Sequence, residues 1–275
     1  MLRRLPGTAP GRPPDRPPRG RPAAGHLTSL LPPFLILLLG SSFNGLTQIL
    51  IWLGAAAVDY AAIYVLRGSG RQAAAPGRFA ERHGLIVVIA LGESIVAVGV
   101  GARGHPLTYP VLAAAVGVLL IAATLWLLYF RQLSADAEAG SLAAGGDTRT
   151  RLAGEVYTFL HLPLVGGIVL TALGVESLLH QVADTEHYDL SEPLHGLSAW
   201  ALGGGVGLFL PGMAAIRIRI DARPCAVLFL GGALCPVAGA GVVHVPGLLA
   251  LALLAALVAA VAVLHGRAVR TGTAA

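Results

Sequence analysis

Long apolar runs separated by short polar breaks fill this sequence from Leu27 onward. A helix that crosses the hydrocarbon core of a bilayer needs about 20 predominantly apolar residues. The runs approach or exceed that length at residues 27–42, 45–66, 83–102, 109–130, 152–179, 197–216, 225–243 and 246–265. Because they are continuous and do not alternate between apolar and polar residues, they predict an all-α integral membrane protein, a bundle of about eight transmembrane helices, and not a β-barrel.

The composition excludes the soluble classes of protein. Of the 275 residues, 55% are hydrophobic and 12% are charged, and the mean hydropathy is +0.74. A soluble domain carries about 25% charged residues, which cover its surface. We therefore exclude a soluble enzyme, a disordered protein and a nucleic-acid-binding module. The lipid bilayer is the first expected partner, and no nucleic acid is expected.

Residues 1–26 form a separate compositional zone. They hold six arginines together with many prolines and glycines and almost no apolar side chains, a composition that does not supply a core. We predict a disordered tail at 1–26, one multi-helix transmembrane domain at 27–266 and a short cytoplasmic tail at 267–275.

The distribution of arginine predicts the orientation of the helices. All 19 basic residues are arginine, and arginine in short connections favours the cytoplasmic side. If the N-terminus is cytoplasmic, every arginine except Arg103 lies in a cytoplasmic segment. The segment 180–196 on the other side contains no arginine and four carboxylates. Eight spans with both termini cytoplasmic account for this asymmetry.

Small residues recur every four positions in two of the runs. Such stripes allow the backbones of membrane helices to approach closely, so we expect both to pack within the bundle. The stripes consist of Ala199, Gly203 and Gly207, and of Ala252, Ala256 and Ala260.

Glu93 is the candidate functional residue that the sequence singles out first, because it lies near the middle of the run 83–102. A central carboxylate costs roughly 3 kcal/mol on insertion scales, and the Leu, Ile and Val residues of the same run return roughly 3–6 kcal/mol. The run can therefore insert, but Glu93 is expected to face other helices or water. Two interpretations follow, a proton or cation site and an interhelical hydrogen bond that fixes packing.

Glu81, Arg82 and His83 form a charged cluster where the run containing Glu93 begins. Arg82 and Glu93 are eleven residues apart, close to three helical turns, so they share a face about 16 Å apart along the axis. They could line one path. The alternative is a capping and snorkelling cluster at the membrane interface.

The run 152–179 carries Glu155 and His161, and Pro163 follows closely enough to kink the helix. We expect His161 either to partner Glu93 or Glu155 or to serve as a hydrogen-bonded structural histidine. Asp59 is a further buried-polar candidate, with Arg67 as one available partner.

Signatures of catalysis and of metal binding are missing from the sequence. The histidines near 180–196 fit no recognised zinc spacing, and no Walker A, G-x-S-x-G or H-E-x-x-H motif is found. We therefore expect no metal, no cofactor and no catalytic residue, which lowers the enzyme hypothesis without removing it.

The segment Arg78–Ile95, which reads RFAERHGLIVVIALGESI, resembles the signature of the bacterial low temperature requirement A family. Ile51–Tyr60 and His161–Leu170 are similar to two other helices of that family. The resemblance implies a multi-pass protein of the bacterial cytoplasmic membrane, linked by name to growth in the cold, without a known biochemical activity. The residues that correspond to its motifs are Phe79, Glu81, Arg82, His83, Gly84, Glu93 and Ser94, followed by Glu155 and His161.

The chain departs from the family pattern in one respect. Family members usually begin with further hydrophobic helices that include a Phe-rich motif containing Phe-Asp-Leu, and here the Arg/Pro-rich tail stands in their place. This difference predicts an N-terminally truncated member.

Three functions remain open at this stage. The first is proton-coupled transport of a small solute or ion through a path that uses Glu93. The second is a non-catalytic role in membrane assembly or cold adaptation, in which buried polar groups only fix packing. The third is a membrane-embedded enzyme acting on a lipid or isoprenoid, which requires Glu93, Glu155 and His161 to converge. A homo-oligomer is compatible with all three.

Overall fold

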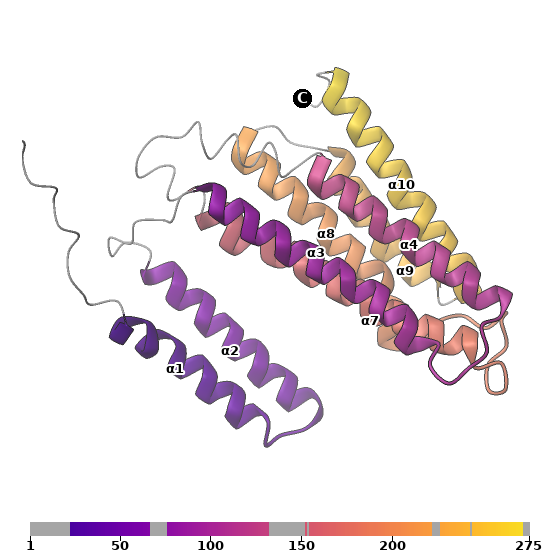
Figure 1. The fold of residues 1–275 in the computed structure, drawn as a ribbon, viewed down its shortest axis with the longest axis horizontal. Helices are drawn as coiled ribbons and strands as arrows, with labels where there is room; N and C mark the ends of the chain where they lie inside the picture. The colour runs from indigo at the N-terminus through magenta and orange to yellow at the C-terminus, as the bar shows by residue number, and fades with distance from the viewer. Residues whose placement is uncertain are drawn as a thin grey trace, which may run out of the picture. The chain divides into compact units, whose positions relative to one another are not determined.

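In the computed structural model, the described residues are 23–66, 76–131, 152, 154–221, 226–242 and 244–271. Their helices follow one another along the chain without an intervening strand, and one isolated bridge joins Pro193 to Pro246. The helices are α1 (Ala23–Gly40), α2 (Gly45–Leu66), α3 (Pro76–Gly101), α4 (Tyr109–Tyr129), the π-helix η2 (Gly154–Leu160) with α7 (His161–Ala183), α8 (Gly196–Asp221), α9 (Ala226–Val242) and α10 (Gly247–Thr271) (Figure 1). Each predicted run coincides with one helix, η2 and α7 together forming the fifth, so the all-α prediction is confirmed.

Five of these helices are long and apolar enough to cross a membrane. The spanning segments are Glu81–Gly101, Tyr109–Tyr129, Glu155–Ala183, Gly196–Ile220 and Gly247–Val269. Shorter apolar segments occur in the three remaining helices, at Leu31–Gly40, Thr47–Ala62 and Ala226–Cys235. The helices therefore define a multi-pass membrane protein, and the orientation of its termini stays a prediction.

The chain divides into two compact units, residues 1–71 and 72–275, where the sequence had predicted one transmembrane domain. In the first unit α1 and α2 form a helical hairpin around a tight turn. The indole Nε1 of Trp52 on α2 donates to the Leu37 carbonyl of α1 over 3.3 Å. A Cβ atom at Gly40 would lie 2.7 Å from Trp52 Cδ1, so glycine is needed for this close approach.

The predicted tail at 1–26 ends earlier than expected, because α1 begins at Ala23, four residues inside it. The rest of that tail lies outside the described residues.

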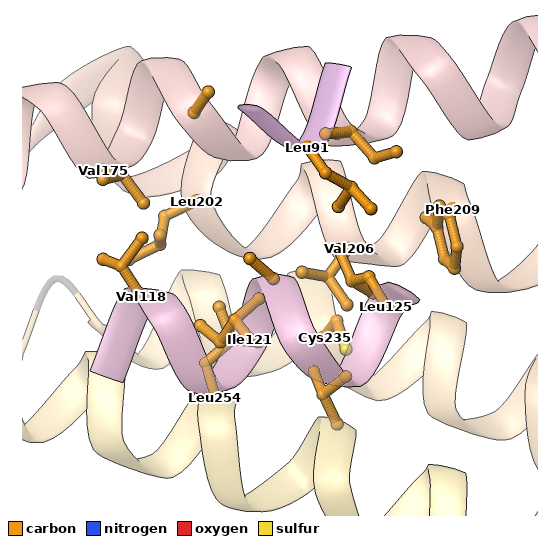
Figure 2. Close-up of a cluster of buried hydrophobic side chains, with 14 of the residues drawn as sticks. Leu91, Val118, Ile121, Leu125, Val175, Leu202, Val206, Phe209, Cys235 and Leu254 are labelled. Carbon is orange, nitrogen blue, oxygen red and sulfur yellow. The ribbon is translucent and has the colours of Figure 1, made fainter. Parts of the chain in front are cut away.

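The second unit packs α3, α4, α7, α8, α9 and α10 side by side (Figure 1). Figure 2 shows buried hydrophobic side chains from these helices pointing toward one another. Because acyl chains are as apolar as leucine, van der Waals fit between the helices holds such a core together, and water exclusion contributes little. The labelled residues are Leu91, Val118, Ile121, Leu125, Val175, Leu202, Val206, Phe209, Cys235 and Leu254.

Small residues set the spacing between α7 and α8. A Cβ atom at Gly167 would lie 2.5 Å from the Gly205 carbonyl oxygen, and one at Gly174 would lie 2.5 Å from the Leu202 amide nitrogen. Ala199 and Gly203, on the predicted α8 stripe, are buried. That stripe packs inside the bundle as predicted.

The corresponding prediction for α10 is wrong. Ala252, Ala256 and Ala260 are all exposed. The helix packs through larger aliphatic residues on its other side, including Leu254 and Val258, which are buried. The size of the side chains decides which face of α10 turns toward the bundle, because large side chains gain more contact area than alanine does.

Candidate functional site

A cluster of aromatic rings lies where α3 and η2 begin and α4 and α8 end, which we call the arginine-rich end. It combines side chains from three segments that are distant in the sequence, and we refer to it as the histidine–tyrosine cluster. Its members are His83 of α3, Tyr129 and Phe130 of α4 and its C-cap, Tyr157 of η2 and His161 of α7.

His161 is the buried centre of this cluster. The residue is 4% exposed, and both ring nitrogens have hydrogen-bond partners. Nδ1 lies 2.8 Å from the Val156 carbonyl oxygen and Nε2 lies 2.9 Å from the Tyr129 hydroxyl. Because a carbonyl only accepts, Nδ1 carries a hydrogen, and in the neutral ring Nε2 then accepts from the Tyr129 hydroxyl.

The local sequence explains why the helix widens beside His161. Pro163 has no amide hydrogen, so a carbonyl one turn earlier loses its helical donor. The backbone from Gly154 to Leu160 adopts a π-helix, a rare geometry that occurs often at functional sites. Within this turn the His161 side chain supplies a donor to the Val156 carbonyl.

His83 connects the buried ring to the edge of the bundle. It is half-buried, and its ring centroid lies 5.2 Å from that of His161 and 5.3 Å from that of Tyr157. The preceding residues Glu81 and Arg82 are exposed. His83 and then His161 therefore lie one after the other on a line from the exposed end of α3 toward the interior.

Glu155 does not partner His161 as the sequence had suggested. Its Oε2 lies 2.5 Å from Arg219 Nε, so it forms an ion pair with α8. The physical reason is helical geometry, since residues six apart lie on different sides of a helix. The pair fastens η2 to the end of α8 at the margin of the histidine–tyrosine cluster.

Glu93 is exposed on α3 in the described part of the chain, so its side chain is not packed inside the second unit, and the expectation that it faces other helices or water stays a prediction. Arg82 is also exposed, and the eleven-residue spacing along α3 puts it on the same side of the helix as Glu93. The surrounding face is apolar, with Ile89 73% exposed and Val96 56% exposed. The opposite, buried side of α3 carries small residues that permit close approach: at Gly101, a Cβ atom would lie 2.5 Å from the Glu176 carbonyl oxygen.

The other candidates are not among the side chains of the histidine–tyrosine cluster. Ser94 is buried on α3, and Asp59 is half-buried on α2, in the other unit. The Arg67 partner considered for Asp59 and the side chain of Phe79 lie outside the described residues. Of the three groups considered for an enzyme, Glu93 is exposed, Glu155 pairs with Arg219, and His161 bonds Tyr129 and Val156.

Sequence reasoning missed the two tyrosines of the cluster. Tyr129 and Tyr157 are 1% and 2% exposed. Both lie close to the predicted membrane interface, where tyrosine is common for general reasons. Position alone therefore did not mark them as partners of a histidine.

Arg217 and His265 were also missed. Both are buried at the arginine-rich end, and they lie close enough to interact electrostatically. They show that α8 carries a guanidinium and α10 an imidazole into the interior at this end. Among the residues that the structure describes, no three His, Cys, Asp or Glu side chains are grouped as metal ligands.

The fold and the histidine–tyrosine cluster together define a polytopic integral membrane protein with a buried, hydrogen-bonded histidine near one end of its helical bundle. Comparison with known proteins then places it more narrowly. The chain belongs to the bacterial low temperature requirement A family, because the family model described as "Bacterial low temperature requirement A protein (LtrA)" matches residues 11–263.

One relative is a protein of Rhizobium meliloti (strain 1021) described as "Uncharacterized protein RA0937". The two sequences are 31% identical over 147 residues, which is 52% of this chain and 32% of the relative. This chain therefore matches about a third of the relative's length. No solved structure matches the chain.

Proposed function

We propose that this chain takes part in proton-coupled transport of a small solute or ion across the bacterial plasma membrane, with His161 as the group that binds the proton. One observation carries the proposal, namely a buried imidazole whose two nitrogens are both hydrogen-bonded, with a second imidazole 5.2 Å away leading toward the bundle edge. Ionisable residues within membrane spans commonly mark ion pathways and proton relays.

The geometry allows His161 to gain and lose a proton without moving heavy atoms. In the neutral ring, Nδ1 donates to the Val156 carbonyl and Nε2 accepts from Tyr129. When Nε2 takes up a proton, it donates to the Tyr129 oxygen, and the hydroxyl rotates from donor to acceptor. The two heavy-atom distances serve both states.

His83 provides the second step of the relay. Its ring centroid lies 5.2 Å from that of His161, so the two imidazoles are close enough to be successive positions on one path. A proton that enters from the arginine-rich end reaches His83 before it reaches His161. The exposed Glu81 and Arg82 lie beside this entry.

Glu93 has a separate role in this proposal. It lies ten residues beyond His83, about 15 Å along α3, and it is exposed among apolar side chains. An ionised carboxylate facing acyl chains is costly, so a carboxylate at this depth needs water or a polar partner beside it when it carries charge. We assign it the mid-membrane proton site, downstream of the histidines.

The test is proton flux in vesicles reconstituted with the full chain, driven by a pH gradient and followed by an entrapped pH-sensitive dye. His161→Gln is expected to reduce the flux at least tenfold, and Glu93→Gln to reduce it to a similar degree. His195→Gln is the matched control, because His195 is an exposed histidine at the opposite end of the bundle. Wild-type flux in His161→Gln would overturn the proposal.

A second function, a non-catalytic structural role in the membrane, is favoured by the close glycine packing between α7 and α8. In that case His161→Gln lowers the melting temperature in nanodiscs, and the vesicles containing wild-type protein leak protons no faster than vesicles of lipid alone. The two functions therefore make opposite predictions about wild-type flux.

A further inference from the structure

A second group of titratable side chains lies at the other end of the bundle, where α7 ends. The His105 ring, from the connection between α3 and α4, lies 5.9 Å from the His180 ring of α7. The His180 ring in turn lies 6.2 Å from the Tyr188 ring. Asp184 and His187 complete the group, and both lie outside the spanning segments.

Asp184 closes a turn by both its backbone and its side chain. Its amide donates to the His180 carbonyl over 2.9 Å, and its carbonyl accepts from the Tyr188 amide over 3.1 Å. Its two carboxylate oxygens each lie 2.9 Å from His187 Nδ1. The backbone bonds persist at any pH, whereas the side-chain pair depends on the charge of His187.

The segment after this turn is fastened to neighbouring helices. The Gln181 side chain donates to the carbonyls of Glu192 and Pro193 over 3.1 and 3.3 Å. The Gly247 amide, where α10 begins, donates to the Glu192 carbonyl over 3.3 Å. These bonds tie the segment after the turn to α7 and to the start of α10.

We propose that the Asp184–His187 pair, with His105 and His180 beside it, is a pH-responsive latch that holds the 184–195 segment closed when His187 is protonated and loosens when His187 loses its proton. The proposal goes beyond the transport function above and does not depend on it. If transport is also correct, the latch lies at the membrane face opposite the His161 relay.

The direction of the pH dependence follows from the charges around the pair. The hydrogen bond to Asp184 and its negative charge raise the pKa of His187, and Glu186 acts in the same direction. The same hydrogen bond lowers the pKa of Asp184, and His105 adds to that effect. His180 lies against the rings of His105 and Tyr188.

A histidine whose pKa is raised on folding stabilises the fold fully below its unfolded value of about 6.5. That contribution is lost as the pH rises through the raised value. The latch is therefore closed in mild acid and weakens as the solution becomes alkaline. In strong acid it opens as well, because Asp184 itself is then protonated.

The experiment is a double-mutant cycle with Asp184→Asn and His187→Gln in the full chain in nanodiscs, followed by thermal unfolding at about pH 5.5 and about pH 8.5. At the lower pH each single variant is expected to lower the melting temperature by roughly 1–3 °C, with the double variant no lower than the worse single variant. At the higher pH the coupling falls to less than half. His195→Gln, an exposed histidine of the same segment, is expected to change nothing at either pH.

Amide hydrogen exchange gives a second readout that does not require unfolding. Relative to the intrinsic rate at each pH, protection of amides 184–195 is expected to fall several-fold between the two pH values in the wild type and to stay constant in His187→Gln. Equal coupling at both pH values, or pH-independent protection in the wild type, would overturn the latch. Neither measurement involves proton flux, so failure of the latch is distinct from failure of the proposed transport function.

Discussion

At the arginine-rich end the His161 ring is 4% exposed and bonded on both sides, whereas at the opposite end the His187 side chain is 73% exposed and bonded to one carboxylate. The comparison shows how differently two histidines of this protein are placed. Because rings surround it, His161 can exchange a proton only through its neighbours. His187 can exchange one with water directly.

The same contrast in burial sets how much free energy of unfolding is lost when a hydrogen bond or ion pair is removed at each end. A buried polar group left without a partner costs about 1–3 kcal/mol, because it has no water to replace the lost bond. An exposed ion pair is worth little, since water and salt screen it. Changes at the arginine-rich end are therefore expected to have the larger effects.

The largest expected effect is that of His161→Leu. It leaves the Tyr129 hydroxyl and the Val156 carbonyl without their partner, and we expect the free energy of unfolding to fall by about 2–5 kcal/mol. Thermal or denaturant unfolding in nanodiscs measures it, with His195→Leu as the exposed control. A loss no greater than that of the control would show that the buried bonds contribute nothing.

Gly167→Ala tests the α7–α8 seam, since α7 joins the two ends. The new Cβ would lie 2.5 Å from the Gly205 carbonyl oxygen and 2.8 Å from the Phe209 amide nitrogen, both backbone atoms that yield only if a helix shifts. We expect a loss of about 1–3 kcal/mol. Gly166→Ala is the adjacent control, because its Cβ would meet Leu208 Cδ2 at an ordinary 3.8 Å. Similar losses for the two variants would refute tight packing at this seam.

Tyr129→Phe removes a single hydrogen bond from the cluster and keeps the ring in place. His161 Nε2 then loses its donor, and we expect a loss of about 1–2 kcal/mol together with slower proton flux. Tyr109→Phe, at a residue that is 90% exposed, is the control for stability. Unchanged flux in Tyr129→Phe would remove the tyrosine from the relay.

Glu155→Gln tests an ion pair whose exposure to solvent is intermediate between that of His161 and that of His187. The Arg219 side chain is 45% exposed and that of Glu155 is 26% exposed, so solvent screens much of the attraction. We expect a loss of at most about 1 kcal/mol, smaller at about 0.5 M salt than at about 0.05 M. A loss that does not change with salt would contradict a screened electrostatic pair.

The smallest expected effect is that of Ser191→Ala at the exposed end. The hydroxyl and amide of Ser191 both donate to Asp189 Oδ1 and lower the pKa of that carboxylate. A depressed carboxylate pKa stabilises the fold above its ordinary value and loses that contribution as the pH falls through the lowered value. The melting temperature of Ser191→Ala should therefore differ from the wild type above about pH 4 and converge with it in stronger acid. A constant difference across this range would contradict the assignment.

The positions of the helices could be predicted from the sequence because hydrophobic length is a local property. α2 spans the predicted residues 45–66, and the other helices agree within several residues at each end. Rotation about the helix axis was not predictable in the same way. The small residues of α3 turn toward α7 at Gly101, and that packing carries Glu93 to the exposed side.

The candidate site was half predictable. His83 and His161 were singled out from their types and positions in the apolar runs. Their association with Tyr129 and Tyr157 depends on how α4, η2 and α7 pack, and the bond from Tyr129 to His161 joins residues 32 apart in the sequence. Local pattern carries no information on such a pairing.

The protonation state of His161 itself is the most direct test of the relay. Solid-state ¹⁵N NMR of histidine-labelled full chain in lipid, with the His161 signals assigned by their loss in His161→Gln, follows each ring nitrogen during acidification. The proposal predicts a neutral ring with hydrogen on Nδ1 at neutral pH and the gain of a proton at Nε2 in acid while the fold is intact. A ring that carries its hydrogen on Nε2, or that stays neutral until the protein unfolds, would contradict it.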